Sequence, residues 1–294
     1  MAKMKKASQI LRLIRVHQWV KNIILFVPLF FAAEMGNFFA LTSVFLAFLA
    51  FCFIASAVYV LNDIRDIEKD RLHPEKKNRP LAKGTISKNN AIFIMIICLV
   101  TGLVISIFTT PWVTWLLLIY VAINLLYSFG LKEFALVDVS IIAAGFLIRI
   151  VTGGIAADVP ASKWLLLLSF LLALFIAFAK RRDDLIILKQ TNVSMRGSLK
   201  GYTLPFVDGI IAFLSAVVVV LYCMYTISDE VIQRIDNEYI FLSAIPVVLG
   251  MIRYLQVTMV FEKSGSPLKI FSSDRFIQLM ILIWISYFGI LLYS

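Results

Sequence analysis

Three oxygen-bearing side chains, Asn62, Asp66 and Asp70, recur at every fourth position of the segment NDIRDIEKD. On a helix, residues four apart lie on one face, so these side chains would form a single stripe, with Asp63 beside it. Oxygen ligands of this kind suit Mg²⁺, a hard cation that proteins usually hold through a few carboxylates together with substrate phosphates. The spacing therefore predicts a Mg²⁺ site, with Mn²⁺ as an alternative ion.

Basic residues follow the stripe at once and could hold the phosphate groups of a substrate. They are Arg71, Lys76, Lys77, Arg79 and Lys83. The alternative is an ordinary solvated loop of mixed charge. Such a loop accounts for the basic residues, but it does not account for a carboxylate stripe joined directly to an apolar segment. We therefore expect a binding role, with Arg79 and Lys83 among the substrate ligands.

A second polar face lies inside the apolar segment 134–157, where Asp138, Ile142, Gly145 and Arg149 share one side of a helix. At a rise of about 1.5 Å per residue, Arg149 would lie about 16 Å beyond Asp138. A charge near the middle of a bilayer costs at least about 2.5 kcal/mol on insertion scales, so it must face a polar interior or a partner. We expect a polar cavity with Asp138 at its mouth and Arg149 at its floor. The alternative is a structural ion pair with a carboxylate on another helix.

Further polar side chains lie near the ends of two other apolar segments. Asn124, Tyr127 and Ser128 share a helical face that could bind a polar ligand, and Lys132 follows them. Tyrosine and lysine also anchor helices at membrane interfaces, so interfacial anchoring is an equal alternative for Tyr127.

The first apolar segment also begins with basic residues, Arg15 and Lys21. Both could contact a lipid phosphate, although ordinary lipid headgroups are the simpler expectation for them.

The elements that position these residues must be membrane spans. Hydrophobic residues make up 61% of the 294 residues and charged residues only 16%, and the mean hydropathy is +0.92. Soluble domains have about 45–50% apolar and about 25% charged residues. Segments of about 20 apolar residues cross the hydrocarbon core of a bilayer. Nine such segments occur, at 18–35, 37–61, 89–108, 112–130, 134–157, 162–180, 203–228, 238–257 and 271–293. We therefore predict an all-α polytopic membrane protein, a single domain over residues 1–294 with a bundle of nine transmembrane helices.

The basic residues predict how the bundle is oriented. Of 28 lysines and arginines, 25 lie at the N-terminus or in alternate connections, whereas only Lys163 and Arg234 lie in the opposite connections. The positive-inside rule then puts the N-terminus in the cytoplasm and the C-terminus outside a plasma or inner membrane. The two long loops, 62–88 and 181–202, and the polar cavity would face the cytoplasm. Because the basic residues form no free arm or stripe, the net charge of +10 does not indicate nucleic-acid binding.

The motif NDIRDIEKD resembles the NDxxDxxxD signature of the UbiA-type intramembrane prenyltransferase superfamily. Nine helices, with Asp-rich cytoplasmic loops after the second and the sixth, match that family over essentially the whole chain. The resemblance implies that a diphosphate substrate binds through Mg²⁺ on those loops while a lipid tail runs into the bilayer.

The second loop departs from the family pattern, in which a DxxxD motif ends the sixth span. The segment AKRRDDLIIL has Asp183 and Asp184 side by side, preceded by Lys180 and Arg181. Basic residues in place of a carboxylate suit a second anion, such as the phosphate of a lipid acceptor. The alternative is that they only anchor the helix at the cytoplasmic surface.

This departure resembles the decaprenyl-phosphate phosphoribosyltransferase branch of the family. The segments RVHQWVKNIILFVPLFF, YSFGLKEFALVDV and GFLIRIVTGGIAADVPASKW resemble the same branch. The resemblance implies transfer of a 5-phosphoribosyl group from phosphoribosyl diphosphate to a polyprenyl phosphate in the bilayer, with release of diphosphate, in cell-wall or glycolipid biosynthesis. Whether the protein forms a homo-oligomer stays open.

Under this resemblance the predicted site consists of catalytic residues and of residues that bind the substrates. Asp138 and Asp184 would contact a second metal ion or the ribose hydroxyls, next to the stripe residues that hold the first ion. The predicted catalytic residues are Asp66, Asp70, Asp138 and Asp184, and the predicted substrate ligands are Lys21, Arg79, Lys83, Tyr127, Lys132, Arg149, Lys180 and Arg181.

Two other functions fit parts of the sequence. A conventional prenyltransferase would move an isoprenoid chain onto an aromatic acceptor, but the second complete DxxxD motif that marks such enzymes is absent. A transporter or lipid flippase would also use an intramembrane arginine. Transporters often contain inverted repeats and helices broken near the midplane, and the sequence has neither feature.

Overall fold

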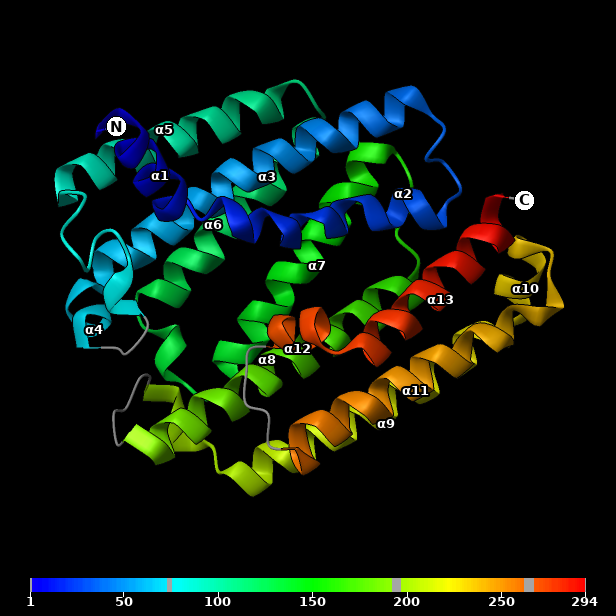
Figure 1. Ribbon diagram of the computed structural model, residues 1–294. Helices are drawn as coiled ribbons and strands as arrows, with labels where there is room; N and C mark the ends of the chain where they lie inside the picture. The colour runs from blue at the N-terminus through cyan, green and yellow to red at the C-terminus, as the bar shows by residue number, and fades with distance from the viewer. Residues whose placement is uncertain (1, 73–75, 192–196, 262–266, 294) are drawn as a thin grey trace. The chain divides into compact units, whose positions relative to one another are not determined.

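The computed structural model describes the whole chain except residues 1, 73–75, 192–196, 262–266 and 294, and the described part contains helices and no strand (Figure 1). Within this part, eight helices are long and apolar enough to cross a membrane. A further pair, Ala7–Leu13 and Val16–Phe31, passes the same test together but is bent by 49°. The predicted all-α polytopic fold is thus confirmed, and the predicted number of nine spans is reached if the bent pair counts as one span.

Many apolar side chains on these helices point outward. Phe93, Ile107, Trp112 and Val220 are all exposed. Water would make such surfaces costly, whereas lipid solvates them as well as it solvates other hydrocarbon. The protein is therefore a multi-pass membrane protein.

The chain divides into two compact units. Unit 1 consists of Met1–Phe134 and Ala144–Ala161. Its elements are α1 (Ala2–Leu13), η1 (Val16–Phe26), α2 (Val27–Phe31), α3 (Phe38–Arg65), α4 (Ile67–Leu72), η2 (Lys76–Asn78), α5 (Lys88–Ile107), α6 (Pro111–Ser128), η3 (Leu131–Glu133) and the larger part of α7 (Val137–Ala157).

Helix α3 is the centre of unit 1. It begins where the Asn37 side chain accepts hydrogen bonds from the backbone N–H groups of Phe39 and Ala40, which would otherwise lack helical partners. Helix α5 lies along it (Figure 1). The close approach depends on Gly102, because a Cβ atom there would lie 2.9 Å from the carbonyl oxygen of Ala50. Small residues at such contacts are the usual way in which membrane helices pack.

Unit 2 consists of Ala135–Ala143 and Ser162–Ser294. Beside the start of α7, its elements are α8 (Lys163–Thr191), η4 (Gly197–Gly201), α9 (Leu204–Thr226), α10 (Asp229–Ile235), η5 (Glu238–Ser243), α11 (Ala244–Leu255), the π-helical turn η6 (Gln256–Val260), α12 (Pro267–Ser273) and α13 (Arg275–Tyr293). Buried side chains of α8, α9 and α11, among them Phe175, Ile211 and Tyr254, form its core.

The structure differs from the sequence prediction in the two long loops. Helix α8 continues to Thr191, so the first part of the predicted loop 181–202 is helical. The helix continues because Leu185 and Leu188 pack against the core of unit 2. The predicted loop 62–88 likewise contains α4 and η2. Residues 73–75 and 192–196 of these loops lie outside the described residues.

Candidate functional site

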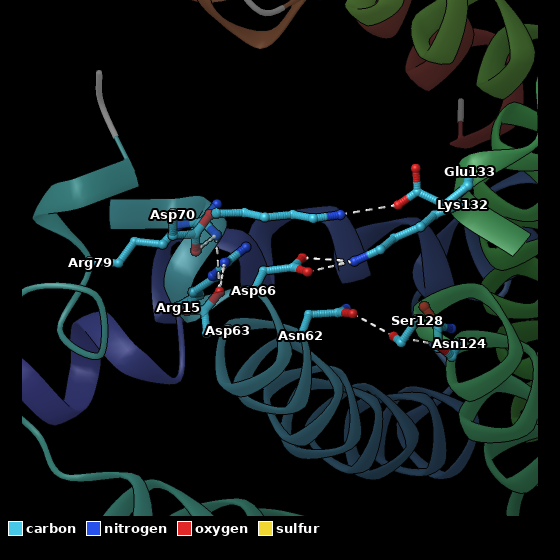
Figure 2. Close-up of polar contacts among 11 residues, drawn as sticks. Arg15, Asn62, Asp63, Asp66, Asp70, Arg79, Asn124, Ser128, Lys132 and Glu133 are labelled. Atoms are coloured by element: carbon cyan, nitrogen blue, oxygen red, sulfur yellow. Dashed lines mark hydrogen bonds and ion pairs between the residues drawn. The ribbon is translucent and has the colours of Figure 1, made fainter. Parts of the chain in front are cut away.

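The predicted carboxylate stripe lies where α3 ends and α4 begins. Helix α3 ends at Arg65, and Asp66 is its C-terminal cap. The backbone N–H of Asp66 still donates to the carbonyl of Asn62 at 3.0 Å, and that of Asp70 donates to the carbonyl of Asp66 at 2.7 Å. The four-residue hydrogen-bond register therefore continues across the break between the two helices, and the side chains keep the predicted spacing (Figure 2).

Asp66 is held by a lysine from another segment. Both of its carboxylate oxygens accept hydrogen bonds from Nζ of Lys132, at 2.7 and 2.9 Å. Next to this pair, the Asn62 side chain accepts a hydrogen bond from the Ser128 hydroxyl (Figure 2). The end of α6 and the start of η3 therefore supply the neighbours of the first two stripe residues.

Local structure places Lys132 over Asp66. Helix α6 ends at Ser128, and the ring of Phe129 lies under the guanidinium of Arg65, 4.2 Å from ring centroid to Cζ. Gly130 then adopts φ of 149°, a conformation that side chains rarely allow. This glycine turns the chain into η3, from which Lys132 reaches across to α3.

Asp63 and Asp70 are bridged by one arginine. Nη1 of Arg79 donates to Asp70 at 2.6 Å and to Asp63 at 3.1 Å. The segment that carries Arg79 is anchored because Leu81 and Ile86 are buried in a cluster with residues of α1 and α3. The expected phosphate ligand Arg79 thus contacts two carboxylates.

Other basic residues of this segment differ from Arg79. Lys83 is exposed. Arg71 forms an ion pair with Glu68, 2.9 Å apart, and donates to the carbonyl of Ala82 at 3.3 Å. Of the two predicted substrate ligands in this segment, Arg79 is held by carboxylates and Lys83 is open to solvent.

Arg15 also belongs to this cluster, a role that the sequence analysis missed by expecting headgroup contacts. It sits at the bend between α1 and η1 with φ of 53° and lies over the ring of Tyr59. It also pairs with Asp63 (Figure 2). Its basic character in an otherwise apolar segment was the available signal. Its partner could not be read from spacing, because Asp63 is 48 residues away.

The donor chemistry of the stripe fits a divalent ion. Asn62, Asp66 and Asp70 offer the oxygen atoms that Mg²⁺ prefers. In the described part of the chain, however, no three His, Cys, Asp or Glu side chains converge closely enough to hold a metal. Asp63 and Asp70 share Arg79, whereas Asp66 is held by Lys132. An ion that binds here must replace Lys132 or Arg79 at one of these carboxylates.

A second charged cluster lies in unit 2, around Asp138. This carboxylate is fully buried and accepts hydrogen bonds from Nε of Arg181 at 2.6 Å and from the hydroxyls of Ser198 and Tyr202, each at 2.9 Å. Burial, helped by the hydrogen bond to Asp138 and by its charge, raises the pKa of Tyr202 to about 12, against the lowering effect of the Leu136 N–H. Ser198 and Tyr202 carried no signal in the sequence pattern.

The basic residues at the end of the sixth predicted span lie in different environments. Arg181 is fully buried, and its Nη1 donates to Asp184 at 2.8 Å. Arg182 pairs with Asp208 at 2.6 Å. Lys180 is exposed. Arg181 is thus enclosed with two carboxylates, whereas the side chain of Lys180 is open to solvent.

Arg149 is buried in unit 1 among neutral groups. Its guanidinium donates to the side chain of Asn22 at 2.8 Å, the carbonyl of Gly145 at 2.6 Å and the hydroxyl of Tyr120 at 3.1 Å. Its Cζ also lies 4.7 Å from the centroid of the Phe51 ring, a favourable cation–π distance. Among the described residues no carboxylate pairs with it, so neither the predicted ion pair nor a bound anion is needed to explain its burial.

Two predicted ligands have less distinctive surroundings. Lys21 and Tyr127 are both half-buried in unit 1. The polar cavity predicted between Asp138 and Arg149 stays a prediction, because these residues belong to different units.

The sequence of this chain is similar to that of a known membrane-protein family. The sequence matches the UbiA prenyltransferase family over residues 23–225. The chain belongs to the UbiA prenyltransferase family. The family resemblance predicted from the NDxxDxxxD motif is therefore confirmed, and the protein is a membrane-embedded transferase of the prenyl or phosphoribosyl type.

Two relatives named as phosphoribosyltransferases match nearly the whole chain. The decaprenyl-phosphate phosphoribosyltransferase of Mycolicibacterium smegmatis is 32% identical over 97% of this chain and 93% of its own length. That of Corynebacterium glutamicum is 30% identical over 95% of this chain and 85% of its own length. The digeranylgeranylglyceryl phosphate synthase of Sulfolobus acidocaldarius is 34% identical but matches only 50% of this chain. The predicted resemblance of this UbiA family member to decaprenyl-phosphate phosphoribosyltransferases is thus confirmed over nearly the whole chain.

Solved structures share the fold. A UbiA homolog from Archaeoglobus fulgidus, bound to GPP and Mg²⁺, has a TM-score of 0.72 and 19% identity, covering 97% of this chain and 100% of that one. Other structures of this homolog contain DMAPP with Mg²⁺, or Cd²⁺. Divalent-metal binding is thus a feature of the structural neighbours of this UbiA family member.

Proposed function

We propose that this protein transfers a 5-phosphoribosyl group from phosphoribosyl diphosphate to a polyprenyl phosphate and releases diphosphate. Similarity to decaprenyl-phosphate phosphoribosyltransferases over nearly the whole chain supports this choice of substrates. The observation that carries the proposal is the cluster of unit 1, in which carboxylates suited to a divalent ion alternate with basic side chains suited to phosphates. Such a cluster can bind a diphosphate together with a metal ion.

Asn62, Asp66 and Asp70 would hold the ion, with Asp63 beside them. When bound, Mg²⁺ supplies charge stabilisation to the leaving diphosphate. Lys132 and Arg79 bind phosphate oxygens and keep the donor in place, and Lys83 adds a solvent-facing positive charge. The ribose passes through a state with oxocarbenium character while the diphosphate leaves.

The acceptor phosphate needs no strong general base, because it is already ionised when it attacks the ribose carbon. The residues therefore act mainly by positioning and by electrostatic stabilisation. Lys180, exposed on α8, would bind the acceptor phosphate. Arg181 would hold Asp184, which is the carboxylate of this cluster that remains partly exposed, toward the ribose hydroxyls or a second ion.

A direct experiment tests the proposal. Purified protein in lipid nanodiscs is incubated with Mg²⁺, phosphoribosyl diphosphate labelled in the ribose, and polyprenyl phosphate. We expect label to become extractable into organic solvent only when both substrates and the ion are present. Chelation of the ion with EDTA should stop the transfer. Absence of lipid-extractable label in the complete mixture would contradict the proposed reaction.

The second candidate is conventional prenyl transfer, favoured by the partial similarity to digeranylgeranylglyceryl phosphate synthases. The same preparation is therefore offered labelled prenyl diphosphates with an aromatic or glycerol phosphate acceptor. Transfer of the prenyl chain in this arm, with none in the phosphoribosyl arm, would replace the first proposal by the second.

A further inference from the structure

The pair formed by Lys132 and Asp66 blocks the atoms that a metal ion would need. Both carboxylate oxygens of Asp66 accept hydrogen bonds from the one ammonium group, at 2.7 and 2.9 Å. Asp66 is also the most accessible of the three carboxylates in this cluster, with 28% of its side chain exposed against 2% for Asp63 and 6% for Asp70. An arriving ion therefore meets Asp66 first and competes there with Lys132.

The charges of the cluster are balanced within the protein. Asp63, Asp66 and Asp70 are paired with Arg15, Arg79 and Lys132, so that three negative charges meet three positive ones. A divalent ion that displaced Lys132 would add positive charge and leave a mostly buried ammonium without an acceptor. Leaving a partly buried charge without its partner is unfavourable. A diphosphate removes this unfavourable free energy, because its oxygens can accept hydrogen bonds from the displaced ammonium.

The backbone keeps the displaced lysine at the site. Lys132 lies in the short helix η3, behind Gly130 with its φ of 149° and the stacked pair of Phe129 and Arg65. The side chain has a flexible four-carbon stem and three donors that can be redirected, so it can change partners while its backbone stays in place. The ammonium group of Lys132 needs only to exchange one hydrogen-bond acceptor, a carboxylate, for another, a phosphate.

We propose that Lys132 exchanges Asp66 for the diphosphate when a divalent ion binds, so that the ion and the diphosphate bind with positive coupling. The inference rests on the proposed function, because it takes a divalent ion and a diphosphate as the ligands. Coupling between two ligands is reciprocal, and it typically amounts to roughly 5- to 150-fold in affinity. In this cluster the lysine transmits part of that coupling from Asp66 to the diphosphate.

Binding of Mn²⁺ in the absence of any phosphate ligand tests the competition without measuring turnover. Equilibrium dialysis compares the wild type with Lys132→Gln, which removes the ammonium. We expect Lys132→Gln to bind Mn²⁺ roughly tenfold more tightly, because the ion no longer displaces a charge-assisted partner in a site that is partly screened by solvent. Lys132→Arg, which can still hold both oxygens of Asp66, should bind Mn²⁺ as weakly as the wild type.

A matched control comes from the neighbouring lysine on α4. Lys69 pairs with Glu133 at 3.4 Å on the exposed surface and donates no hydrogen bond to Asp63, Asp66 or Asp70. Lys69→Gln removes the same charge from a neighbouring exposed position and should leave Mn²⁺ affinity unchanged. An equal gain in both glutamine variants would mean that general electrostatics, not partner exchange, sets the affinity, and this result would overturn the proposal.

The effect of the ion on the affinity for phosphoribosyl diphosphate tests the other half of the coupling. Binding of labelled phosphoribosyl diphosphate is measured with and without Mn²⁺, and the tightening by the ion should be several times smaller in Lys132→Gln than in the wild type. Unchanged Mn²⁺ affinity in Lys132→Gln overturns the exchange but leaves the proposed function standing. Failure of every variant to bind Mn²⁺ and phosphoribosyl diphosphate together overturns both.

Discussion

At the scale of single residues, the carboxylates at the junction of α3 and α4 carry the proposed metal chemistry. Asp66→Asn and Asp70→Asn preserve size but remove a hard anionic ligand, so each should nearly abolish transfer at limiting Mg²⁺. Glu68→Gln is the control, since Glu68 lies on the same short helix and pairs only with exposed Arg71 in the described structure. Steady-state transfer across a Mg²⁺ titration measures the effect. Near-normal turnover of either asparagine variant at limiting Mg²⁺ would show that the stripe is not the metal site.

Lys180 allows a separate prediction at the residue scale. If it binds the acceptor phosphate, Lys180→Ala loses a charge-assisted contact worth about 1.5–3 kcal/mol, which corresponds to a KM for polyprenyl phosphate raised roughly ten- to a hundredfold. The KM for phosphoribosyl diphosphate should change little. Lys189→Ala, which removes another exposed charge from α8, should leave both values near those of the wild type. An unchanged lipid dependence in Lys180→Ala would remove this residue from the site.

At the scale of elements, the turn between α6 and η3 determines where Lys132 points. Gly130 has φ of 149°, and a Cβ atom there would meet no neighbour within 4 Å, so the strain of a substitution is purely conformational. Gly130→Ala should cost about 1–3 kcal/mol locally and lower turnover by displacing Lys132, while the protein still folds. Gly209→Ala is the matched control, because its Cβ also meets nothing and α9 is helical there. Equal turnover in both variants would mean that the turn does not position Lys132.

The segment after α8 is tied to α7 through the Asp138 cluster, which predicts a pH effect. Because the folded protein raises the pKa of Tyr202 to about 12, from a value of about 10 in an unfolded chain, its contribution to stability is complete below about pH 10. That contribution should be lost as the pH rises from 10 to 12. Thermal unfolding of the wild type and Tyr202→Phe over this range checks the prediction. The stability difference between the two should shrink with rising pH, and a constant difference would contradict it.

At the scale of the whole molecule, the bent first segment decides the topology. If Ala7–Leu13 and Val16–Phe31 cross the bilayer together, the chain has nine spans and its termini lie on opposite sides; if they re-enter, it has eight and the termini share a side. The distribution of basic residues predicts nine spans, with the N-terminus in the cytoplasm and the C-terminus outside. Alkaline phosphatase fused to the C-terminus should therefore be active, and a fluorescent protein fused there should be dark. The reverse pattern would support the eight-span arrangement.

Arg149 illustrates where reasoning from the sequence reached its limit. Its place near the middle of a predicted span required a partner, and the expected partners were a carboxylate or an anion. The structure supplies Asn22, Tyr120 and a backbone carbonyl instead, together with aromatic rings. Neutral dipoles and aromatic rings thus surround this guanidinium where a carboxylate was expected, and residue spacing in the sequence does not distinguish the two arrangements.

The sequence by itself determined the membrane-spanning helices and the carboxylate stripe. Both depend on local properties, the length of an apolar run and the 3.6-residue period of a helix, so they are visible without knowledge of packing. Only the tertiary structure decided which charges meet. Arg15 and Asp63 are 48 residues apart, Lys132 and Asp66 are 66 apart, and Arg181 and Asp138 are 43 apart. Poorly solvated charges must find partners on whichever helix packs beside them, and that choice is made by the packing of the helices.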